Sequence, residues 1–415
     1  MKGYMLLPEN LEVNPFFIKQ VTEDYQRFAK EGLPPQVEEY ILEKYKMDVS
    51  STYAGYKIKN PFGIASGQLS TTIHQAEKGI QDGLGFIVLK TVISQDPKGS
   101  SGMEAWKVNA PKMTVEPLVS KSGKQGYTVT WKGRGWHKSF EEYLELMEQS
   151  LHLWKATEVP VIPSCKFQLP STVEEGFHVE EYSYTLQKLY EVWEKVWKDA
   201  PLLLEKDFSP TLAGSSLAKS QEMILWWITH VPMQIKEVAG EKGIRLGMKL
   251  MNAMFDDEFQ LQVLETAAKS QADYLICFNR LFNPDKEFEG KKGVAYGGYD
   301  LSDRNLKILN QYNQKNQGKQ KVKKPISATG NIESGKMMIE YALRGCENGQ
   351  IHSFFQWPAS EYAMEKGSKV EKSLHQLFFH PEKGLLTGMQ YLHEQNILPS
   401  KDGVLHFKEI CTREQ

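Results

Sequence analysis

Eight short apolar segments place the strongest constraint on the fold of this chain. They are residues 62–66, 86–91, 159–166, 201–207, 245–251, 274–279, 325–329 and 349–354. Most lead into a polar or Gly/Ser-rich loop, and amphipathic stretches separate them, which is typical of buried parallel strands joined by helical crossovers. Eight such strands predict an α/β fold, a TIM-type (β/α)8 barrel.

The connections contain helices and one conspicuous insertion. Residues 139–156 start with a Ser before two glutamates and then carry apolar residues at helical spacing, which predicts a helix, and residues 179–198 predict another. Between the second and third strands, residues 111–131 contain two β-prone runs around the sequence KSGK, which predicts a hairpin. We expect this insertion, about residues 100–137, to cover the carboxyl ends of the strands.

Helical segments flank the barrel on both sides. Residues 15–29 and 35–45 predict two helices separated by GLPP, the first with an apolar stripe that we expect to pack against the barrel. We therefore divide the chain into an N-terminal helical extension (1–50), the barrel (51–370) and a C-terminal helical tail (371–415). A chain of 415 residues does not require a second full domain.

Composition excludes several classes of function. Lysine and arginine (50) nearly balance aspartate and glutamate (52), so no domain-scale basic field favours nucleic acid as a partner. No window is apolar enough for a membrane span and no signal peptide is evident, which predicts a cytoplasmic protein. The four cysteines are widely spaced, which argues against an iron–sulfur cluster or a bound metal. Electron chemistry would then need an organic cofactor.

The last two predicted strands end in a pattern suited to a phosphate group. Residues 326–335 read ISATGNIESG, a strand that runs through a glycine turn into a helix, and residues 349–354 read GQIHSF. Neighbouring strand ends of this kind direct backbone N–H groups and a helix N-terminus at one point, which is what a phosphate dianion requires. In a TIM-type barrel this is the phosphate site after strands seven and eight.

Several of these segments together resemble the FMN-dependent dihydroorotate dehydrogenase family, which includes the flavin barrel of dihydropyrimidine dehydrogenase. The likeness covers roughly residues 55–365. The matching pieces occur in the family's order: NPFGIASG at 60–67, GLGFIVLKT at 83–91, MKL at 248–250, CFN at 277–279, YGG at 296–298, and the two phosphate turns. The resemblance implies a flavin barrel with FMN as cofactor.

The resemblance assigns the cofactor-binding residues by position. Ala65, Ser66 and Gly67 would pass their backbone beneath the isoalloxazine, where small residues are needed. Lys90 and Lys249 would face the flavin edge that becomes negative on reduction, and would act as catalytic cations. The remaining cofactor contacts would be Asn279, Gly298, Thr329, Gly330, Asn331, His352 and Ser353. For His352, either the ring or the backbone N–H could serve the phosphate, and Asn331 is one of the few non-glycine residues that tolerate a positive φ.

The family's catalytic base is a Cys or Ser directly before a proline in the loop after the fourth strand. The matching stretch, residues 204–211, reads LEKDFSPT, which makes Ser209 the candidate base. A serine hydroxyl is a weak base, so it would act through a water or a relay, and Lys206, Asp207 or Thr211 could tune it.

The substrate side departs from the family's pattern. Relatives that oxidise dihydroorotate use several asparagines, whereas only Asn279 stands at such a position here. Thr211 and Arg280 replace an asparagine and a small hydroxyl residue, and the lid segment 130–136 reads TWKGRGW. Arg280 and Lys132 could hold a carboxylate. We assign Asn279, Thr211, Arg280 and Lys132 to the substrate site.

These features predict an oxidoreductase acting on a CH–CH bond next to a carbonyl, with dihydroorotate or a related dihydropyrimidine as the small-molecule substrate, a role in pyrimidine metabolism. Two alternatives stay open: a flavin-binding barrel without turnover that serves as a sensor or scaffold, and a phosphate-binding lyase or isomerase that uses Lys249. The sequence leaves the electron acceptor undefined and allows a homodimer.

Overall fold

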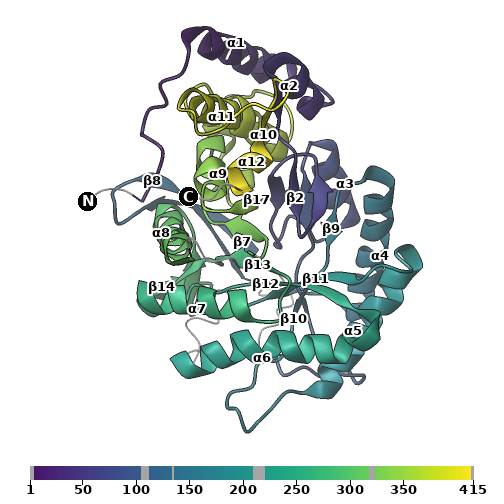
Figure 1. The fold of residues 1–415 in the computed structure, drawn as a ribbon. Helices are drawn as coiled ribbons and strands as arrows, with labels where there is room; N and C mark the ends of the chain where they lie inside the picture. The colour runs from purple at the N-terminus through teal and green to yellow at the C-terminus, as the bar shows by residue number, and fades with distance from the viewer. Residues whose placement is uncertain (1–3, 104–111, 133–134, 209–219, 317–322, 413–415) are drawn as a thin grey trace.

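A closed barrel of parallel strands forms the centre of the computed structural model, which describes residues 4–103, 112–132, 135–208, 220–316 and 323–412 (Figure 1). Its strands are β4 (Phe62–Ile64), β5 (Phe86–Val88), β6 (Val92–Ile93), β9 (Val161–Ile162), β10 (Ser164–Lys166), β11 (Leu202–Asp207), β12 (Ile244–Lys249), β13 (Tyr274–Cys277), β16 (Ile326–Thr329) and β17 (Cys346–Ile351). The ladder closes where β17 pairs with β4. The predicted TIM-type barrel is confirmed.

Two of the eight predicted strands are each split into two short pieces. The second contributes β5 and β6, and the third contributes β9 and β10 on either side of Pro163. Strand β5 pairs with β9, whereas β10 pairs with β6 and β11, so the ladder continues across the break. A proline has no N–H for a ladder hydrogen bond, which explains an interruption at this point.

Helices surround the strands on the outside of the barrel (Figure 1). They are α3 (Ile73–Gln81), α4 (Phe140–Thr157), α5 (Val179–Val196), α6 (Gln221–Ala239), α7 (Asp257–Lys269), α8 (Tyr299–Asn316) and α9 (Gly335–Ala342). Helix α4 starts after a capping box, in which Ser139 and Glu142 each accept a hydrogen bond from the other's backbone N–H. Helices α4 and α5 confirm the two crossover helices predicted from the sequence.

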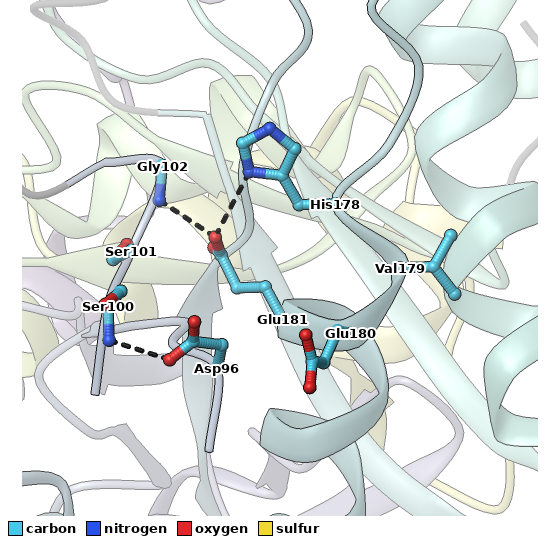
Figure 2. A pocket seen from close by; sticks show the side chains of 8 residues that line it. All are labelled: Asp96, Ser100, Ser101, Gly102, His178, Val179, Glu180 and Glu181. Atoms are coloured by element: carbon cyan, nitrogen blue, oxygen red, sulfur yellow. Dashed lines mark hydrogen bonds and ion pairs between the residues drawn. The ribbon is translucent and has the colours of Figure 1, made fainter. Parts of the chain in front are cut away.

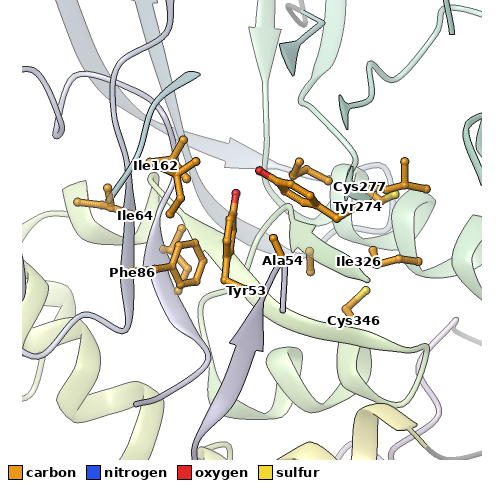
Figure 3. Packing of buried hydrophobic residues seen from close by; sticks show 14 of the residues in the cluster. Tyr53, Ala54, Ile64, Phe86, Ile162, Tyr274, Cys277, Ile326 and Cys346 are labelled. Atoms are coloured by element: carbon orange, nitrogen blue, oxygen red, sulfur yellow. The ribbon is translucent and has the colours of Figure 1, made fainter. Parts of the chain in front are cut away.

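The amino ends of the barrel strands enclose an aromatic floor. The hairpin of β2 (Ser51–Tyr53) and β3 (Tyr56–Ile58) brings Tyr53 between Phe86 and Tyr274, with ring centroids 4.6 and 5.5 Å away (Figure 3). Gly63 and Gly247 leave room for these rings, because an added Cβ atom would lie within 2.4 Å of Phe86 or 2.2 Å of Tyr274. The lumen is thus filled at this end, so ligand chemistry belongs to the opposite end.

Two antiparallel hairpins cover the carboxyl ends of the strands. The predicted hairpin is present as β7 (Lys112–Val119) and β8 (Gln125–Lys132). A second hairpin, β14 (Leu281–Phe288) and β15 (Lys291–Tyr296), was not anticipated, and β15 lies against β8. Its turn is Glu289-Gly290, with φ of 53° and 73°, and positive φ at both positions is the geometry of a tight two-residue hairpin.

The N-terminal helices α1 (Pro15–Glu31) and α2 (Val37–Tyr45) confirm the two predicted there, and α1 packs against α10 (Lys369–Phe379) and α11 (Leu385–Glu394). Strand β1 (Met47–Asp48) pairs with β18 (Leu405–His406), next to α12 (Phe407–Thr412). The two ends of the chain therefore share one layer beside the barrel. Across the described residues, none of the helices has both the length and the apolar character needed to cross a membrane.

Candidate active site

Charged side chains line the lumen where the barrel strands end. Lys166, Asp207 and Lys249 stand at the ends of β10, β11 and β12, and Asp207 and Lys249 are partners in the ladder. Lys166 Nζ lies 2.9 Å from Asp207 Oδ2, and all three side chains are buried. Burial raises the pKa of Asp207, but the charges of Lys166 and Lys249 outweigh it and bring this pKa below its usual value. Asp207 is therefore a carboxylate at neutral pH.

Lys249 also belongs to a buried hydrogen-bonded network in the lumen. Its ammonium donates to Gln350 Oε1 at 2.8 Å and lies 3.6 Å from Glu205 Oε1. Glu205 Oε2 accepts hydrogen bonds from Gln350 Nε2 at 2.6 Å and from the Tyr53 hydroxyl at 2.9 Å. The aromatic floor and the strand-end charges are thus connected through polar side chains.

Lys90 is buried in the same region. Burial lowers the pKa of Lys90 to about 7, and the positive charges of Lys166, Arg280 and Lys249 act in the same direction, against the opposing effect of Asp207. The structure therefore brings Lys90 and Lys249 within electrostatic reach of each other. A nearby negative charge would stabilise the ammonium form of Lys90.

Asn279 and Arg280 follow β13 and are engaged by the protein itself. Asn279 Nδ2 donates to Asp207 Oδ1 at 2.8 Å and to the Phe208 carbonyl at 2.9 Å, so both amide hydrogens are used within the chain. Arg280 Nη1 donates to the carbonyls of Val129 in β8 and Ala295 in β15. Arg280 thereby fastens both hairpins to the end of the barrel, and burial lowers its pKa to about 9.

The loop after β4 supplies a backbone surface beside these cations. Ala65 N donates to the Ile351 carbonyl at 2.9 Å, and the hydroxyls of Ser66 and Thr91 lie 2.6 Å apart. A Cβ atom on Gly67 would lie 2.5 Å from the His352 ring, so the ring rests directly on the glycine backbone. Burial lowers the pKa of His352 to about 3, and the nearby cations add to this effect, so the ring is neutral.

The first of the two predicted phosphate turns has an unusual backbone conformation. Gly330 has φ of 116° and Asn331 has φ of 53°, the left-handed geometry that Asn tolerates. Side chains fix this turn from behind, because Tyr341 donates its hydroxyl hydrogen to the Gly330 carbonyl and Asn305 donates to the Thr329 carbonyl. Helix α9 begins directly after, with its Ser334 cap accepting from Met337 N.

The other phosphate contacts inferred from the sequence lie at neighbouring strand ends. Gly298 has φ of 77° before α8, and Ser353 follows β17. One carboxylate also stands here: Glu333 accepts a hydrogen bond from the Tyr299 hydroxyl, and burial raises its pKa to about 6. A dianion bound at this turn would meet both favourable backbone geometry and one acidic neighbour.

Some predicted site residues fall outside the described part of the chain. Ser209 and Thr211 lie in the segment 209–219, and Lys132 is described in its backbone only, as the last residue of β8. Conversely, the structure places Lys166, Glu205 and Gln350 in the lumen, where sequence reasoning did not expect them. The signal was present as charged or amide residues inside otherwise buried strands, since such residues are seldom buried without a partner.

A separate open pocket lies beside the strand ends, between the loop after β6 and the start of α5 (Figure 2). Glu181 forms its wall and accepts hydrogen bonds from Gly102 N at 2.9 Å and from the Ser94 hydroxyl. His178 Nδ1 lies 3.8 Å from the same carboxylate. These contacts fasten the loop to α5.

A known structure shares this fold across nearly the whole chain. It is a crystal structure of DHODH from Eimeria tenella in complex with ferulenol, with a TM-score of 0.53 and 14% sequence identity over 94% of this chain and 95% of that chain. No protein-family description and no curated protein sequence matches this chain. The likeness establishes that this chain has a TIM-type barrel of the DHODH kind.

Proposed function

We propose that this protein is an FMN-dependent oxidoreductase that oxidises a CH–CH bond next to a carbonyl, with dihydroorotate or a related dihydropyrimidine as its substrate. The buried pair of Lys90 and Lys249 at the carboxyl end of the barrel carries the proposal. Several cations are buried together here, since the charges of Lys166, Arg280 and Lys249 all lower the pKa of Lys90. Negative charge that develops between Lys90 and Lys249 would be stabilised strongly because water is excluded.

The chain offers suitable contacts for each part of FMN. Gly67 and the residues before it would lie beneath the ring system, and the Gly330–Asn331 turn with the start of α9 would hold the phosphate. His352 is neutral and lies on Gly67, so it would contact the edge of the flavin ring system rather than add positive charge there. When bound, the flavin supplies the hydride acceptor that the reaction needs.

The protein's own residues would divide the remaining work. Ser209 is the proposed base that removes the substrate proton through a water or relay. Lys90 and Lys249 would stabilise the negative charge that hydride transfer generates. Because both amide hydrogens of Asn279 are engaged by Asp207 and Phe208, this side chain would position Asp207 in the free protein, and would contact substrate only by exchanging a hydrogen bond.

The spectrum of the purified protein tests the proposal. We expect the purified protein to show the visible absorbance of oxidised flavin, and this absorbance to bleach when dihydroorotate is added without oxygen. A Ser209→Ala variant should keep the colour but bleach more slowly. Bleaching by another dihydropyrimidine alone would reassign the substrate, and a protein that neither contains nor takes up FMN would refute the proposal.

A second candidate, a flavin-binding barrel without turnover, is favoured by one specific arrangement. Arg280, inferred to bind substrate, instead holds the hairpins through the carbonyls of Val129 and Ala295. In that case the yellow protein would be inert to every dihydropyrimidine, and Ser209→Ala would behave like the wild type.

A further inference from the structure

Glu205 is a carboxylate enclosed in the lumen below the proposed site. It lies on β11 two residues before Asp207, and alternate residues of a strand face the same side, so both carboxylates point into the barrel. Its ladder partner on β12 is Gly247, so no side chain at that position separates Glu205 from Lys249, two residues further along β12. Glu205 is completely buried, and burial raises its pKa, whereas the charge of Lys249 and the hydrogen bonds from Gln350 and Tyr53 favour the ionised form.

The contacts of Glu205 fix its orientation toward Lys249. One oxygen, Oε2, accepts from Gln350 Nε2 and from the Tyr53 hydroxyl, at 2.6 and 2.9 Å. The other oxygen, Oε1, lies 3.6 Å from Lys249 Nζ. Gln350 completes a ring, because its Oε1 accepts from the same ammonium at 2.8 Å.

We propose that Glu205 is a positioning residue that holds the Lys249 ammonium through Gln350 and offsets its charge, and thereby tunes the reduction potential of a flavin bound above it. This inference rests on the proposed function for the flavin, but the contact between Glu205 and Lys249 is independent of it. It assigns a role to a residue that would itself touch neither flavin nor substrate.

The physical argument concerns the field at the flavin edge. In a water-excluded lumen, charges a few ångströms apart interact far more strongly than in solution. A lysine ammonium alone favours the reduced, anionic flavin, whereas a carboxylate 3.6 Å behind that ammonium opposes it. Removal of the carboxylate charge should therefore raise the reduction potential.

Glu205→Gln in the FMN-loaded protein tests this, because glutamine keeps the shape of the side chain and removes its charge. We expect the midpoint potential of the bound flavin to rise by the equivalent of a roughly tenfold change in the ratio of reduced to oxidised flavin, ~30 mV for a two-electron couple. Glu347→Gln is the matched control: Glu347 is a partly buried carboxylate that accepts from the Thr52 hydroxyl at 2.6 Å, and its replacement should leave the potential unchanged. An unchanged or lower potential in Glu205→Gln overturns the inference.

A second measurement works without flavin. In protein labelled with 15N-lysine, the Lys249 ammonium should exchange its protons slowly, because it is enclosed and bonded to Gln350, and Lys249→Arg identifies its signal. Exchange should become several-fold faster in Glu205→Gln, or in Tyr53→Phe if the first variant does not fold. If the protein takes up no FMN, the proposed function fails, and this exchange decides the positioning role: unchanged exchange overturns it.

Discussion

Replacement of Asp207 by asparagine should destabilise the protein, because it leaves Lys166 buried beside a neutral amide. The two groups lie 2.9 Å apart, with side chains only 4% and 8% exposed. Loss of one partner from a buried ion pair costs about 3–5 kcal/mol. Unfolding entropy scales to about 0.9 kcal/mol per kelvin for a chain of 415 residues, so the melting temperature should fall by roughly 3–6 °C.

The pH dependence of this loss has a defined sign. The pKa of Asp207 is lower in the folded protein than its ordinary value of 3.8. The ionised side chain therefore stabilises the fold fully above pH 3.8, and this contribution is lost as the pH falls through the folded-state pKa. In chemical denaturation, the difference in free energy of unfolding between wild type and Asp207→Asn should therefore have its full size at pH 7 and shrink only in strong acid.

Two controls separate the ion pair from a general effect of mutation. Glu148→Gln breaks an exposed pair with Lys195, whose side chains are 35% and 54% exposed, and should cost less than about 1 kcal/mol. The double variant Lys166→Met/Asp207→Leu should recover much of the stability, since removal of both charges also removes the cost of burying them. If Asp207→Asn is as stable as Glu148→Gln, or if the double variant costs the sum of its parts, the reasoning is wrong.

Three further outcomes follow from the site. Gly330→Ala should lower stability by about 1–3 kcal/mol and weaken FMN binding, because φ is 116° and the new Cβ would lie 2.7 Å from Asn305 Nδ2; equal FMN affinity in a fluorescence titration would contradict this. Orotate affinity, measured by calorimetry, should fall as pH rises through about 7, where Lys90 loses its charge, and should become flat with pH in Lys90→Met. Glu333→Gln should tighten FMN binding at pH 7.5 and change it little at pH 5, because the pKa of this carboxyl is about 6; weaker binding at pH 7.5 would show that the carboxylate supports the cofactor.

The fold was predictable because the strands of a barrel are buried on both faces. Such strands appear in a sequence as short continuous apolar runs, and all eight runs became strands of the barrel. The second hairpin was missed because β14 carries polar and charged residues between its apolar ones, and its turn is Glu-Gly rather than the commoner Asn-Gly or Asp-Gly. Strand β15 lies against β8, and no local sequence pattern encodes such a tertiary contact.

The site was predictable only where it depends on strand ends. Lys90, Lys249 and the Gly330–Asn331 turn were proposed as site residues from their motifs, and the structure buries both lysines close enough for the charge of Lys249 to lower the pKa of Lys90. The partners of Lys249 could not be identified from the sequence, because Glu205 and Gln350 are 145 residues apart in the chain and only barrel closure joins their strands. A charged residue inside an apolar run predicts a buried partner, but it does not identify that partner.

The polar network also explains how the two ends of the barrel depend on each other. Tyr53 packs on Phe86 and Tyr274 in the aromatic floor, and its hydroxyl, the polar handle of a buried ring, needs a hydrogen-bond acceptor. Glu205 supplies that acceptor and in turn faces Lys249. The hairpin that closes the amino end of the barrel therefore helps to orient the Lys249 ammonium near the carboxyl end. The buried polar side chains in the lumen connect the two ends.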